Sequence, residues 1–406
     1  MDIFTREKER ILQTYRRLNV EIVRGEGVYL IDRKGKRYLD AFGGLAVNLL
    51  GHRHPELIRA ICHQLECYVH LSNVFIQEAQ LSLADRLSAL SGLNRVFYCN
   101  SGAEAVEGAL KLVRKWGRGL GRRKVVSFDG GFHGRTMGAL SLMSQVRYRD
   151  GYEPLLAECF QVPFNDVEAF CRVIDRQTAA VFLECIQGER GVIPIQEDLV
   201  NTLKEYRRQY GFLLVVDEVQ TGLGRTGTFI AARNWDLDPD IVLLAKGLGG
   251  GLPLGAILTR EQIAGVFGIG GHGSTMGGNP VACRAGCALL DVLERDDLYG
   301  RARVIGNTVM ARIRQLQGQY PDWIKDVRGI GCIVGVEFLF GAEQIACRCL
   351  EKGLLVNVTH GNVIRFLPPL TFGDEHVART CDIVEEVIHE LAEKESNYSV
   401  GKVNGV

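Results

Sequence analysis

The residues 213–258, which include LLVVDEVQTGLGRTG and DPDIVLLAKGLGGGLPLGAIL, decide how this chain folds. Two short apolar runs here are of the kind that form buried strands: Phe212 to Val216, which begins one residue before this stretch, and Ile241 to Ala245. The first run leads directly into Asp217 and the second leads directly into Lys246. The pattern therefore predicts two strands that each deliver one charged side chain at their carboxyl end.

A lone carboxylate and a lone amine at the ends of buried strands are costly to desolvate unless something pairs with them. In an open α/β sheet, this edge is also where ligands bind. Pyridoxal 5′-phosphate offers an aldehyde to a lysine and a basic ring nitrogen to an acid. Since desolvation lowers the pKa of an amine, we expect Lys246 to be a nucleophile. The alternatives are a surface role for Lys246 and a capping or ion-pair role for Asp217.

Composition and charge argue against a nucleic-acid-binding, membrane-spanning or secreted protein. The 406 residues suggest two or three domains, and 48 basic residues balance 48 acidic ones. Without a basic stripe, nucleic acid is not an expected partner. The apolar runs are too short to span a bilayer and the charged N-terminus lacks a secretory core, so we expect a cytoplasmic protein without a membrane partner.

The twelve cysteines are scattered along the chain. They form no paired CxxC sets and no His/Cys clusters, so we expect no metal site. In such a chain, reduced thiols are the better interpretation. Cys62, Cys283 and Cys287 lie in apolar helical patterns and are expected to be small core residues.

Helical and strand patterns alternate through the first two thirds of the chain. The expected helices are Pro55 to Tyr68, Glu78 to Leu90 and Ala103 to Trp116. The expected strands are Arg95 to Cys99, Lys124 to Phe128, Ala179 to Leu183, Phe212 to Val216 and Ile241 to Ala245. This alternation predicts an α/β fold whose mostly parallel sheet carries helices on both faces.

The two ends of the chain show other patterns. A short helix is expected near the start, and GVYLID and RYLD predict a hairpin that turns at 33–36. A long helical pattern follows Pro280 and continues past Arg301. After it come an expected strand at 329–339, a helix at 342–352, strands at 354–358 and 363–367, and a helix at 375–393. We predict an N-terminal segment at 1–45, a large cofactor-binding domain at 46–300, a small α+β domain at 301–395 and a flexible polar tail at 396–406.

Two glycine-containing segments are candidates for phosphate binding. Ser101, Gly102 and Ala103 lie between a strand and a helix, where free amide groups favour an anion. Ordinary helix capping by Ser101 is the alternative. The run at 247–251 is not a dinucleotide motif, because LPL follows it and opens no helix.

Many motifs along the chain resemble one family. They include NSGAEAVEGALKLVRKW, GGFHGRTMGALS, ECIQGERGV, VVDEVQTGLGRTG, LLAKGLGGG, HGSTMGGNP and VIRFLPPL, in that order. Over nearly the whole chain, the sequence resembles the class III aminotransferases, which have fold type I of the enzymes that use pyridoxal 5′-phosphate. The resemblance implies that the protein transfers an ω-amino group to 2-oxoglutarate. N2-acetylornithine is the expected donor, which implies a place in arginine biosynthesis.

The resemblance also implies roles for residues at matching positions. Lys246 would bond covalently to the cofactor and then carry the proton, and Asp217 would keep the pyridine nitrogen protonated. Gln220 would contact the ring hydroxyl and Phe132 would stack on the ring. The phosphate would be bound by Ser101, Gly102 and Ala103 and by Thr275 of a neighbouring subunit, so a homodimer is expected.

Three residues are expected to bind the substrates. The resemblance implies that Arg135 binds a substrate carboxylate through two parallel hydrogen bonds. Glu189 would mask Arg365 while the amino donor is bound and release it for 2-oxoglutarate. Arg190 and Cys185 depart from the usual residues of the family, and Arg190 is expected to offer Glu189 a second partner.

Several alternatives stay open. His133 is expected to form a wall of the pocket, while Arg365 could simply pair within the core. The donor could be ornithine, succinylornithine, 4-aminobutyrate or an acyl-lysine. Leu45 stands where ornithine enzymes tend to carry Tyr, but the segment 359–366 resembles theirs. A mutase of the same fold and a non-catalytic protein that binds the cofactor are further alternatives.

Overall fold

The computed structural model describes the chain over residues 2–403. Its main layer is a sheet of seven strands in the order β4-β12-β11-β10-β7-β5-β6. The strands are β4 Arg95–Cys99, β5 Lys124–Phe128, β6 Cys159–Val162, β7 Thr178–Leu183, β10 Leu213–Asp217, β11 Ile241–Leu244 and β12 Gly255–Thr259. Strands β6, β5, β7, β10 and β11 are paired in parallel, and β12 is antiparallel to β11 and β4. The predicted α/β fold with a mostly parallel sheet is confirmed, whereas β6 and β12 were not predicted.

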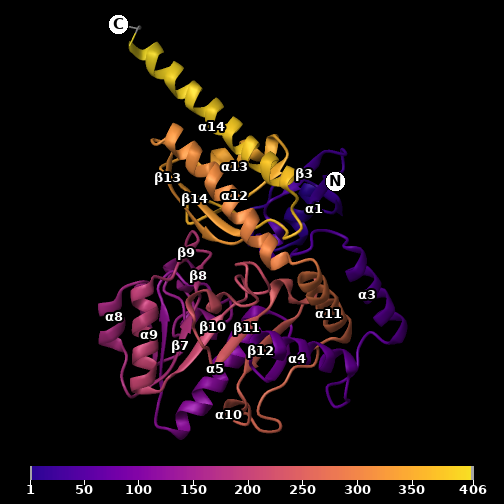
Figure 1. The fold of residues 1–406 in the computed structure, drawn as a ribbon, viewed down its shortest axis with the longest axis vertical. Coiled ribbons are helices and arrows are strands. Elements are labelled where there is room, and N and C mark those ends of the chain that lie inside the picture. Colours follow the sequence, from indigo (N-terminus) through magenta and orange to yellow (C-terminus); the bar gives the residue numbers. More distant parts are fainter. Residues whose placement is uncertain (1, 404–406) are drawn as a thin grey trace.

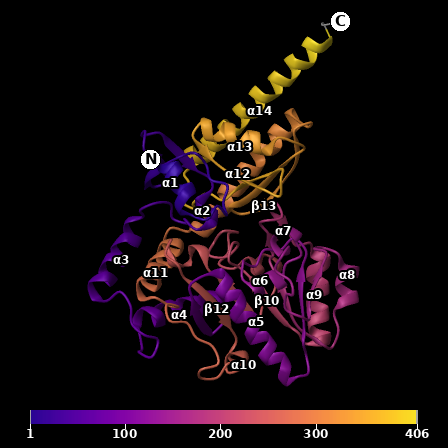
Figure 2. The same ribbon diagram turned by 180° about the vertical axis from the view of Figure 1, so that it is seen from behind.

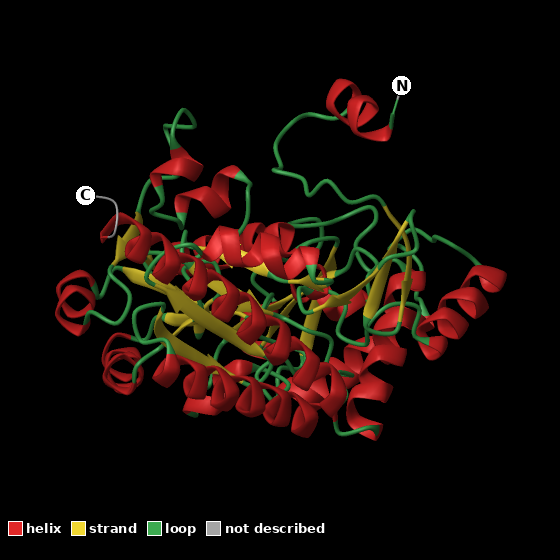
Figure 3. Ribbon diagram, turned by 90° about the horizontal axis from the view of Figure 1, so that it is seen from above, coloured by secondary structure: helices red, strands yellow, loops and turns green. Residues whose placement is uncertain are grey.

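Helices cover both faces of this sheet (Figure 3). They include α3 Pro55–Cys67, α4 Glu78–Ser91, α5 Gly102–Gly119, α8 Val167–Val173, α9 Glu197–Tyr210 and α11 Pro280–Arg295. Strand β10 shows why both faces must be covered. Leu213 and Val215 join a core that includes α5, while Leu214 and Val216 join the larger core on the other side. A strand buried on both faces is apolar at every position, which is the pattern that the sequence shows.

A second, smaller unit stands above the main sheet in Figure 1. Its antiparallel sheet has the order β13-β14-β17-β16. The elements are α12 Leu298–Gln319, β13 Ile324–Ile330, β14 Ile333–Phe338, α13 Ala342–Glu351, β15 Leu354–Leu355, β16 Asn357–Thr359, β17 Val363–Phe366 and α14 Asp374–Val403. The expected single strand at 329–339 is wrong, because the chain reverses at Gly331. The φ of Gly331 is +56°, and a Cβ there would lie 2.6 Å from the backbone carbon of Thr226.

The N-terminal segment belongs structurally to this smaller unit. After α1 Ile3–Arg10, strands β1 Ile22–Glu26, β2 Tyr29–Asp32 and β3 Arg37–Asp40 form antiparallel pairs, as the hairpin prediction requires. Strand β15 then pairs in parallel with β3, so both ends of the chain contribute to one sheet. Figure 2 shows the same arrangement from behind, with α12, α13 and α14 above the main sheet, and Figure 3 shows the N-terminal helix α1 apart from the rest of the chain.

Two expectations about the helices need correction. The long helical pattern after Pro280 is two helices, because Asp297 adopts a φ of +42° and caps α12 by accepting a hydrogen bond from the Gly300 amide. Helix α14 continues to Val403, where a tail was expected from residue 396. Residues 404–406 lie outside the described part of the chain, and flexibility there stays a prediction.

All twelve cysteines are free. Cys283 is buried and Cys287 is half-buried, but Cys62 is exposed, so its expected core position is wrong. Helix α3 buries only one side, chiefly Leu57 and Gln64, and Cys62 lies off that side. Among the described residues, no helix combines the length and the apolar character that a membrane span requires.

Candidate active site

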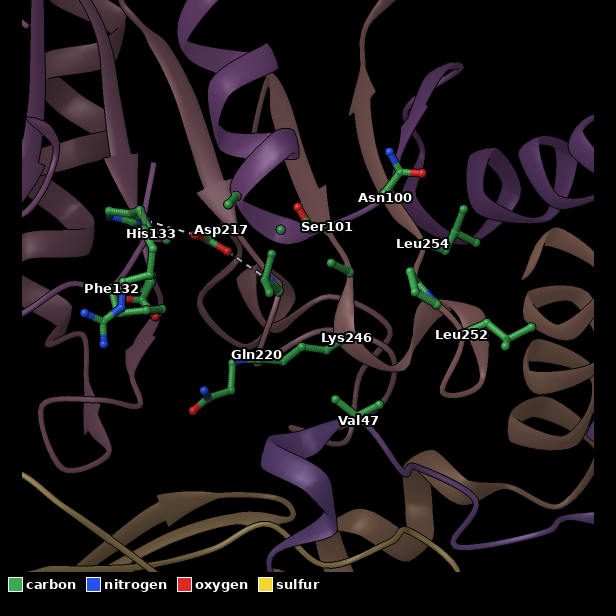
Figure 4. Close-up of a pocket in the computed structure, with 18 of the residues that line it drawn as sticks. Val47, Asn100, Ser101, Phe132, His133, Asp217, Gln220, Lys246, Leu252 and Leu254 are labelled. Carbon is green, nitrogen blue, oxygen red and sulfur yellow. Dashed lines mark hydrogen bonds and ion pairs between the residues drawn. The ribbon is translucent and has the colours of Figure 1, made fainter. Parts of the chain in front are cut away.

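A cavity of about 440 Å³ opens at the carboxyl ends of β10 and β11 (Figure 4), a size typical of small-molecule sites. It brings together nine residues that the sequence singled out. They are Ser101, Gly102, Ala103, Phe132, His133, Arg135, Asp217, Gln220 and Lys246. The β-strand ends thus converge as the sequence predicts.

Lys246 follows β11, and its side chain lines the cavity. Its φ of +47° is unusual for a residue with a side chain, and such backbone strain costs about 1–3 kcal/mol. Burial lowers the pKa of Lys246 to about 8, although the charge of Glu189 acts in the opposite direction. The amine is therefore neutral, and nucleophilic, over a much wider range of pH than a surface lysine.

The glycines after Lys246 form a short 3₁₀ turn, η2 Lys246–Gly249, rather than a simple loop. A Cβ on Gly247 would lie 2.5 Å from Cδ1 of Leu49. The glycine therefore lets the turn pack closely against the segment that follows α2 Gly43–Ala46. This packing fixes the backbone from which Lys246 projects.

Asp217 is buried at the end of β10 and is held from two sides. His133 Nδ1 lies 2.8 Å from its Oδ2 atom, and the Val219 amide donates to its Oδ1 atom over 3.1 Å. Burial opposes a charge on His133, but the hydrogen bond and charge of Asp217 outweigh this effect and raise the pKa of His133. Glu218 bonds elsewhere, to Thr221, as the alternation along a strand predicts. His133 is therefore more than a wall of the pocket, because it orients the carboxylate of Asp217.

Glu184 is a site residue that the sequence analysis missed. It follows β7 and accepts a hydrogen bond from the Phe132 amide over 2.8 Å. Burial raises the pKa of Glu184 to about 8, although the charge of His133 acts in the opposite direction. The sequence pattern that located Asp217 and Lys246 also fits Glu184, which is a third charged residue at the carboxyl end of a buried strand. Together, Glu184 and Asp217 fix the backbone of Phe132 and the side chain of His133.

The first turn of α5 also lines the cavity. Ser101 caps the helix, since its Oγ atom accepts a hydrogen bond from the Glu104 amide over 3.2 Å. No protein group in the described part of the chain accepts a hydrogen bond from the amides of Gly102 and Ala103. A Cβ on Gly102 would lie 2.9 Å from Val219 Cγ1, so only glycine lets this turn approach so closely. Free amides at a helix start favour a phosphate.

These groups fit pyridoxal 5′-phosphate. Lys246 offers an amine with a lowered pKa, Asp217 offers a carboxylate for a ring nitrogen, and the first turn of α5 offers amide donors for a phosphate. All three lie around one cavity of suitable size (Figure 4).

Arg365 and Glu189 form an ion pair beside this cavity. Nη1 of Arg365 lies 2.8 Å from Oε1 of Glu189 and also donates to Oε1 of Gln220 over 3.0 Å. Nε and Nη2 of Arg365 donate to Oδ1 of Asn357 over 3.1 Å and 2.6 Å. The side chain of Arg365 is 1 % exposed, whereas that of Glu189 is 24 % exposed. Arg365 is thus fixed in place, and Glu189 is the partner with room to move.

Asn357 was not predicted as a site residue, although the strand register leads to it. Residues 357 and 365 are directly paired across the β16–β17 ladder. Burial raises the pKa of Glu189, but the charge and hydrogen bond of Arg365 outweigh burial and the net shift is downward. Glu189 is therefore ionised when it contacts Arg365.

Arg190 does not act as expected. Its Nη1 atom donates to the carbonyl oxygen of Asp129 over 2.8 Å, and in the described residues no ion pair joins it to Glu189. A Cβ on Gly130 would lie 2.1 Å from Cδ of Arg190, so the arginine stem lies directly across that glycine. The expected second partner for Glu189 is therefore absent from this arrangement.

Thr275 lies apart from the other predicted residues. It is exposed, and it does not line the cavity of its own chain. Its neighbour Ser274 accepts a hydrogen bond from Asn100 Nδ2 over 3.3 Å, which holds the loop near the start of α5.

Comparison with known proteins assigns the family. The family model described as aminotransferase class-III matches residues 12–388. The acetylornithine aminotransferase of Archaeoglobus fulgidus is 43 % identical over 384 residues, which cover 95 % of this chain and all of the relative. The acetylornithine aminotransferase of Aquifex aeolicus is also 43 % identical, and the match covers 93 % of this chain and 99 % of that relative.

Solved structures agree with this assignment. The ornithine aminotransferase of Toxoplasma gondii superposes with a TM-score of 0.93 at 32 % identity, and the match covers 97 % of this chain and 95 % of that one. The acetylornithine aminotransferase of Elizabethkingia anophelis superposes with a TM-score of 0.87 at 34 % identity, over 95 % and 98 % of the two chains. The chain therefore belongs to the class III aminotransferases, enzymes that depend on pyridoxal 5′-phosphate.

Proposed function

We propose that this aminotransferase transfers the ω-amino group of N2-acetylornithine to 2-oxoglutarate. The products would be N-acetylglutamate 5-semialdehyde and glutamate, in arginine biosynthesis. The observation that carries the proposal is the buried Arg365 with its displaceable partner Glu189 next to Lys246. The relatives from Archaeoglobus fulgidus and Aquifex aeolicus support acetylornithine as the donor.

The chain's own residues have separate tasks in this reaction. When bound, pyridoxal 5′-phosphate would supply an electron-withdrawing ring that takes up negative charge from the substrate. Asp217, oriented by His133, would hold a proton on the ring nitrogen, and Phe132 would pack against the ring. The amides of Gly102 and Ala103 would hold the phosphate, and Gln220 would contact the ring hydroxyl. Lys246 would hold the cofactor at rest and would then accept and return the proton of the substrate carbon.

The Glu189–Arg365 pair lets one cavity accept two unlike substrates. An ω-amine donor presents only carbon atoms near Arg365, so the guanidinium must be neutralised by Glu189. In the second half-reaction, 2-oxoglutarate presents its α-carboxylate at the same place. Glu189 then moves away, and Arg365 binds that carboxylate, while Arg135 binds the carboxylate common to both substrates.

Replacing Glu189 with Ala should free Arg365 and change the choice of donor. We expect the ratio of half-reaction rates, glutamate over acetylornithine, to rise by about tenfold or more, because a buried unpaired cation favours a substrate carboxylate. The ratio is measured from the absorbance change of the cofactor on adding each donor. Arg190 should not restore masking, because it is bound to Asp129.

The matched control is Arg365→Ala, which should abolish the use of 2-oxoglutarate. Removing both members should harm the acetylornithine half-reaction less than removing Glu189 alone. An unchanged ratio in Glu189→Ala, together with loss of 2-oxoglutarate use in Arg365→Ala, would show that Glu189 does not mask Arg365.

A donor panel tests the substrate directly. With 2-oxoglutarate as the acceptor, kcat/KM is measured for acetylornithine, ornithine, succinylornithine, 4-aminobutyrate and an acyl-lysine. We expect the highest value for acetylornithine. Ornithine is the second candidate, because the Toxoplasma gondii structure is that of an ornithine aminotransferase. Turnover with none of these donors would favour a protein that binds the cofactor without catalysis.

We also propose that the working unit is a homodimer in the cytoplasm. Thr275 lies outside its own cavity, and the exposed apolar side chains Val74, Phe75 and Ile76 precede α4. Burial of such a patch against a second copy would stabilise the pair. Free thiols suit a reducing compartment.

In solution, the active species should have twice the mass of the chain. Dilution that separates the subunits should reduce activity, because each cavity would lose the Thr275 of its partner. Light scattering and activity are measured over the same dilution series. A fully active monomer at low concentration would contradict the homodimer.

A further inference from the structure

Arg135 is held by an aromatic ring rather than by a carboxylate. Its guanidinium carbon lies 4.2 Å from the ring centroid of Tyr148 and 5.6 Å from that of Phe132. Within the described residues, no carboxylate forms an ion pair with Arg135, whose side chain is exposed at the cavity. A cation over an aromatic face is attracted to it while the N–H groups at its edge stay free.

Tyr148 is itself fixed to the loop that carries Arg135. It lies on the short helix α7 Val146–Arg149, and Phe132 meets its ring edge-on with the centroids 5.7 Å apart. Just before this helix, Gln145 donates from Nε2 to the carbonyl oxygen of Gly131 over 3.2 Å. A ring contact and a hydrogen bond thus tie Tyr148 and the start of α7 to the loop at 131–135.

Arg147 holds the other end of the tyrosine. Its Nη2 atom donates to the Tyr148 hydroxyl over 2.7 Å, and its guanidinium carbon lies 4.5 Å from the ring centroid. Arg149 donates to the carbonyl oxygen of Met143 and to Oε1 of Gln161, which anchors α7 to the main body. The ring is therefore preorganised before any substrate arrives.

We propose that Tyr148 is a positioning residue that holds Arg135 ready for the carboxylate common to both substrates. This inference rests on the proposed function of Arg135. A carboxylate in place of Tyr148 would compete with the substrate for the guanidinium, whereas the ring restrains the side chain and leaves its hydrogen-bond donors free. Restraint before binding lowers the entropy lost when the substrate binds.

The test compares Tyr148→Leu, which removes the aromatic face, with Tyr148→Phe, which keeps it. We expect Tyr148→Leu to raise KM for the amino donor and for 2-oxoglutarate by about three- to tenfold, with kcat within about twofold of the wild type. Tyr148→Phe loses the hydrogen bond from Arg147 but keeps the ring between the two guanidinium groups, so it should stay within about twofold for both constants. Cofactor absorbance of each holoenzyme and its melting temperature are recorded alongside.

An amine without a carboxylate, such as a simple alkylamine, distinguishes a specific effect on the position of Arg135 from a general disruption of the active site. Its half-reaction does not use Arg135, so Tyr148→Leu should leave its rate constant unchanged. An equal loss with this amine, or loss of bound cofactor, would mean that Tyr148 supports Phe132 instead and would overturn the proposal. If Tyr148→Leu does not fold, Tyr148→Met removes the aromatic face at similar volume and replaces it in every comparison.

A double-mutant cycle gives the decisive result. In Arg135→Ala, the further change Tyr148→Leu should have no effect on KM for 2-oxoglutarate, because its target is gone. Additive effects of the two substitutions would overturn the proposal. Failure of the proposed function is recognised separately, since Arg135→Ala alone would then leave KM for both substrates unchanged.

Discussion

Replacing Lys246 with Ala is expected to lower the rate of amino transfer by about 10⁴-fold or more, with the fold and cofactor binding retained. Among the described residues that line the cavity, Lys246 is the one amine, and both its bond to the cofactor and its proton transfer would be lost. Asp217, Phe132 and the first turn of α5 remain to hold the cofactor. Turnover of Lys246→Ala near the wild-type rate would contradict this role.

Lys246→Arg is the matched control. It keeps a cation in the cavity, but a guanidinium does not lose its proton and cannot act as the nucleophile. The same loss of activity is therefore expected. Absorbance spectra with and without a donor show whether the cofactor is bound and whether it reacts.

The pH dependence gives a second measurement for Lys246. Only the neutral amine attacks an aldehyde, and the pKa of about 8 lies below the ordinary value of 10.5. Covalent capture of pyridoxal phosphate by cofactor-free protein should therefore rise with pH and reach half of its maximum near pH 8. A midpoint near 10.5 would show that burial does not perturb this lysine.

Replacing Asp217 with Ala is the second large effect, with an expected loss of about 10²–10³-fold in turnover. The substitution removes the charge that keeps a proton on the ring nitrogen, and it also leaves the buried His133 without its partner. Breaking a buried charged pair costs about 3–5 kcal/mol of stability, so the melting temperature should fall as well. Turnover and cofactor absorbance are measured for the variant.

Asp217→Asn separates charge from shape, because it keeps the size of the side chain and loses only the negative charge. It should be nearly as slow as Asp217→Ala if the charge matters. Glu218→Gln serves as the neighbouring comparison, since Glu218 bonds to Thr221 and to the Ala232 amide on the other face. That variant should lose thermal stability before it loses turnover. Unchanged cofactor binding and turnover in Asp217→Ala would make the aspartate merely structural.

The sequence predicted the large sheet and the centre of the cavity for one physical reason. Buried parallel strands are continuous apolar runs, and a charged residue directly after such a run must face a ligand or a partner. This reasoning located Asp217 and Lys246 and applies equally to Glu184. Strand β12 was not predicted because its apolar run, Ala256 to Leu258, has only three residues. Pro253 and Gly255 stand just before this run and are typical of a loop.

Other parts of the site depend on contacts that no local pattern encodes. The bonds from Arg365 to Asn357 follow from the register of two strands, and the Arg190 bond to a carbonyl oxygen follows from the close approach of Gly130. Tyr148 lies on a four-residue helix that has no sequence signature of its own. The role of Thr275 depends on a second chain and stays a prediction.

The pairing of β15 with β3 has a consequence for how this protein is made. Leu39 and Asp40 pair with Leu354 and Leu355, which leave the ribosome more than 300 residues later. The hairpin at the amino end must therefore wait through most of synthesis for its final neighbour. Contacts so distant in sequence slow folding, because a long loop must close before they form. The nascent chain thus exposes unpaired strand edges for a long time, and such edges are where a chaperone would bind.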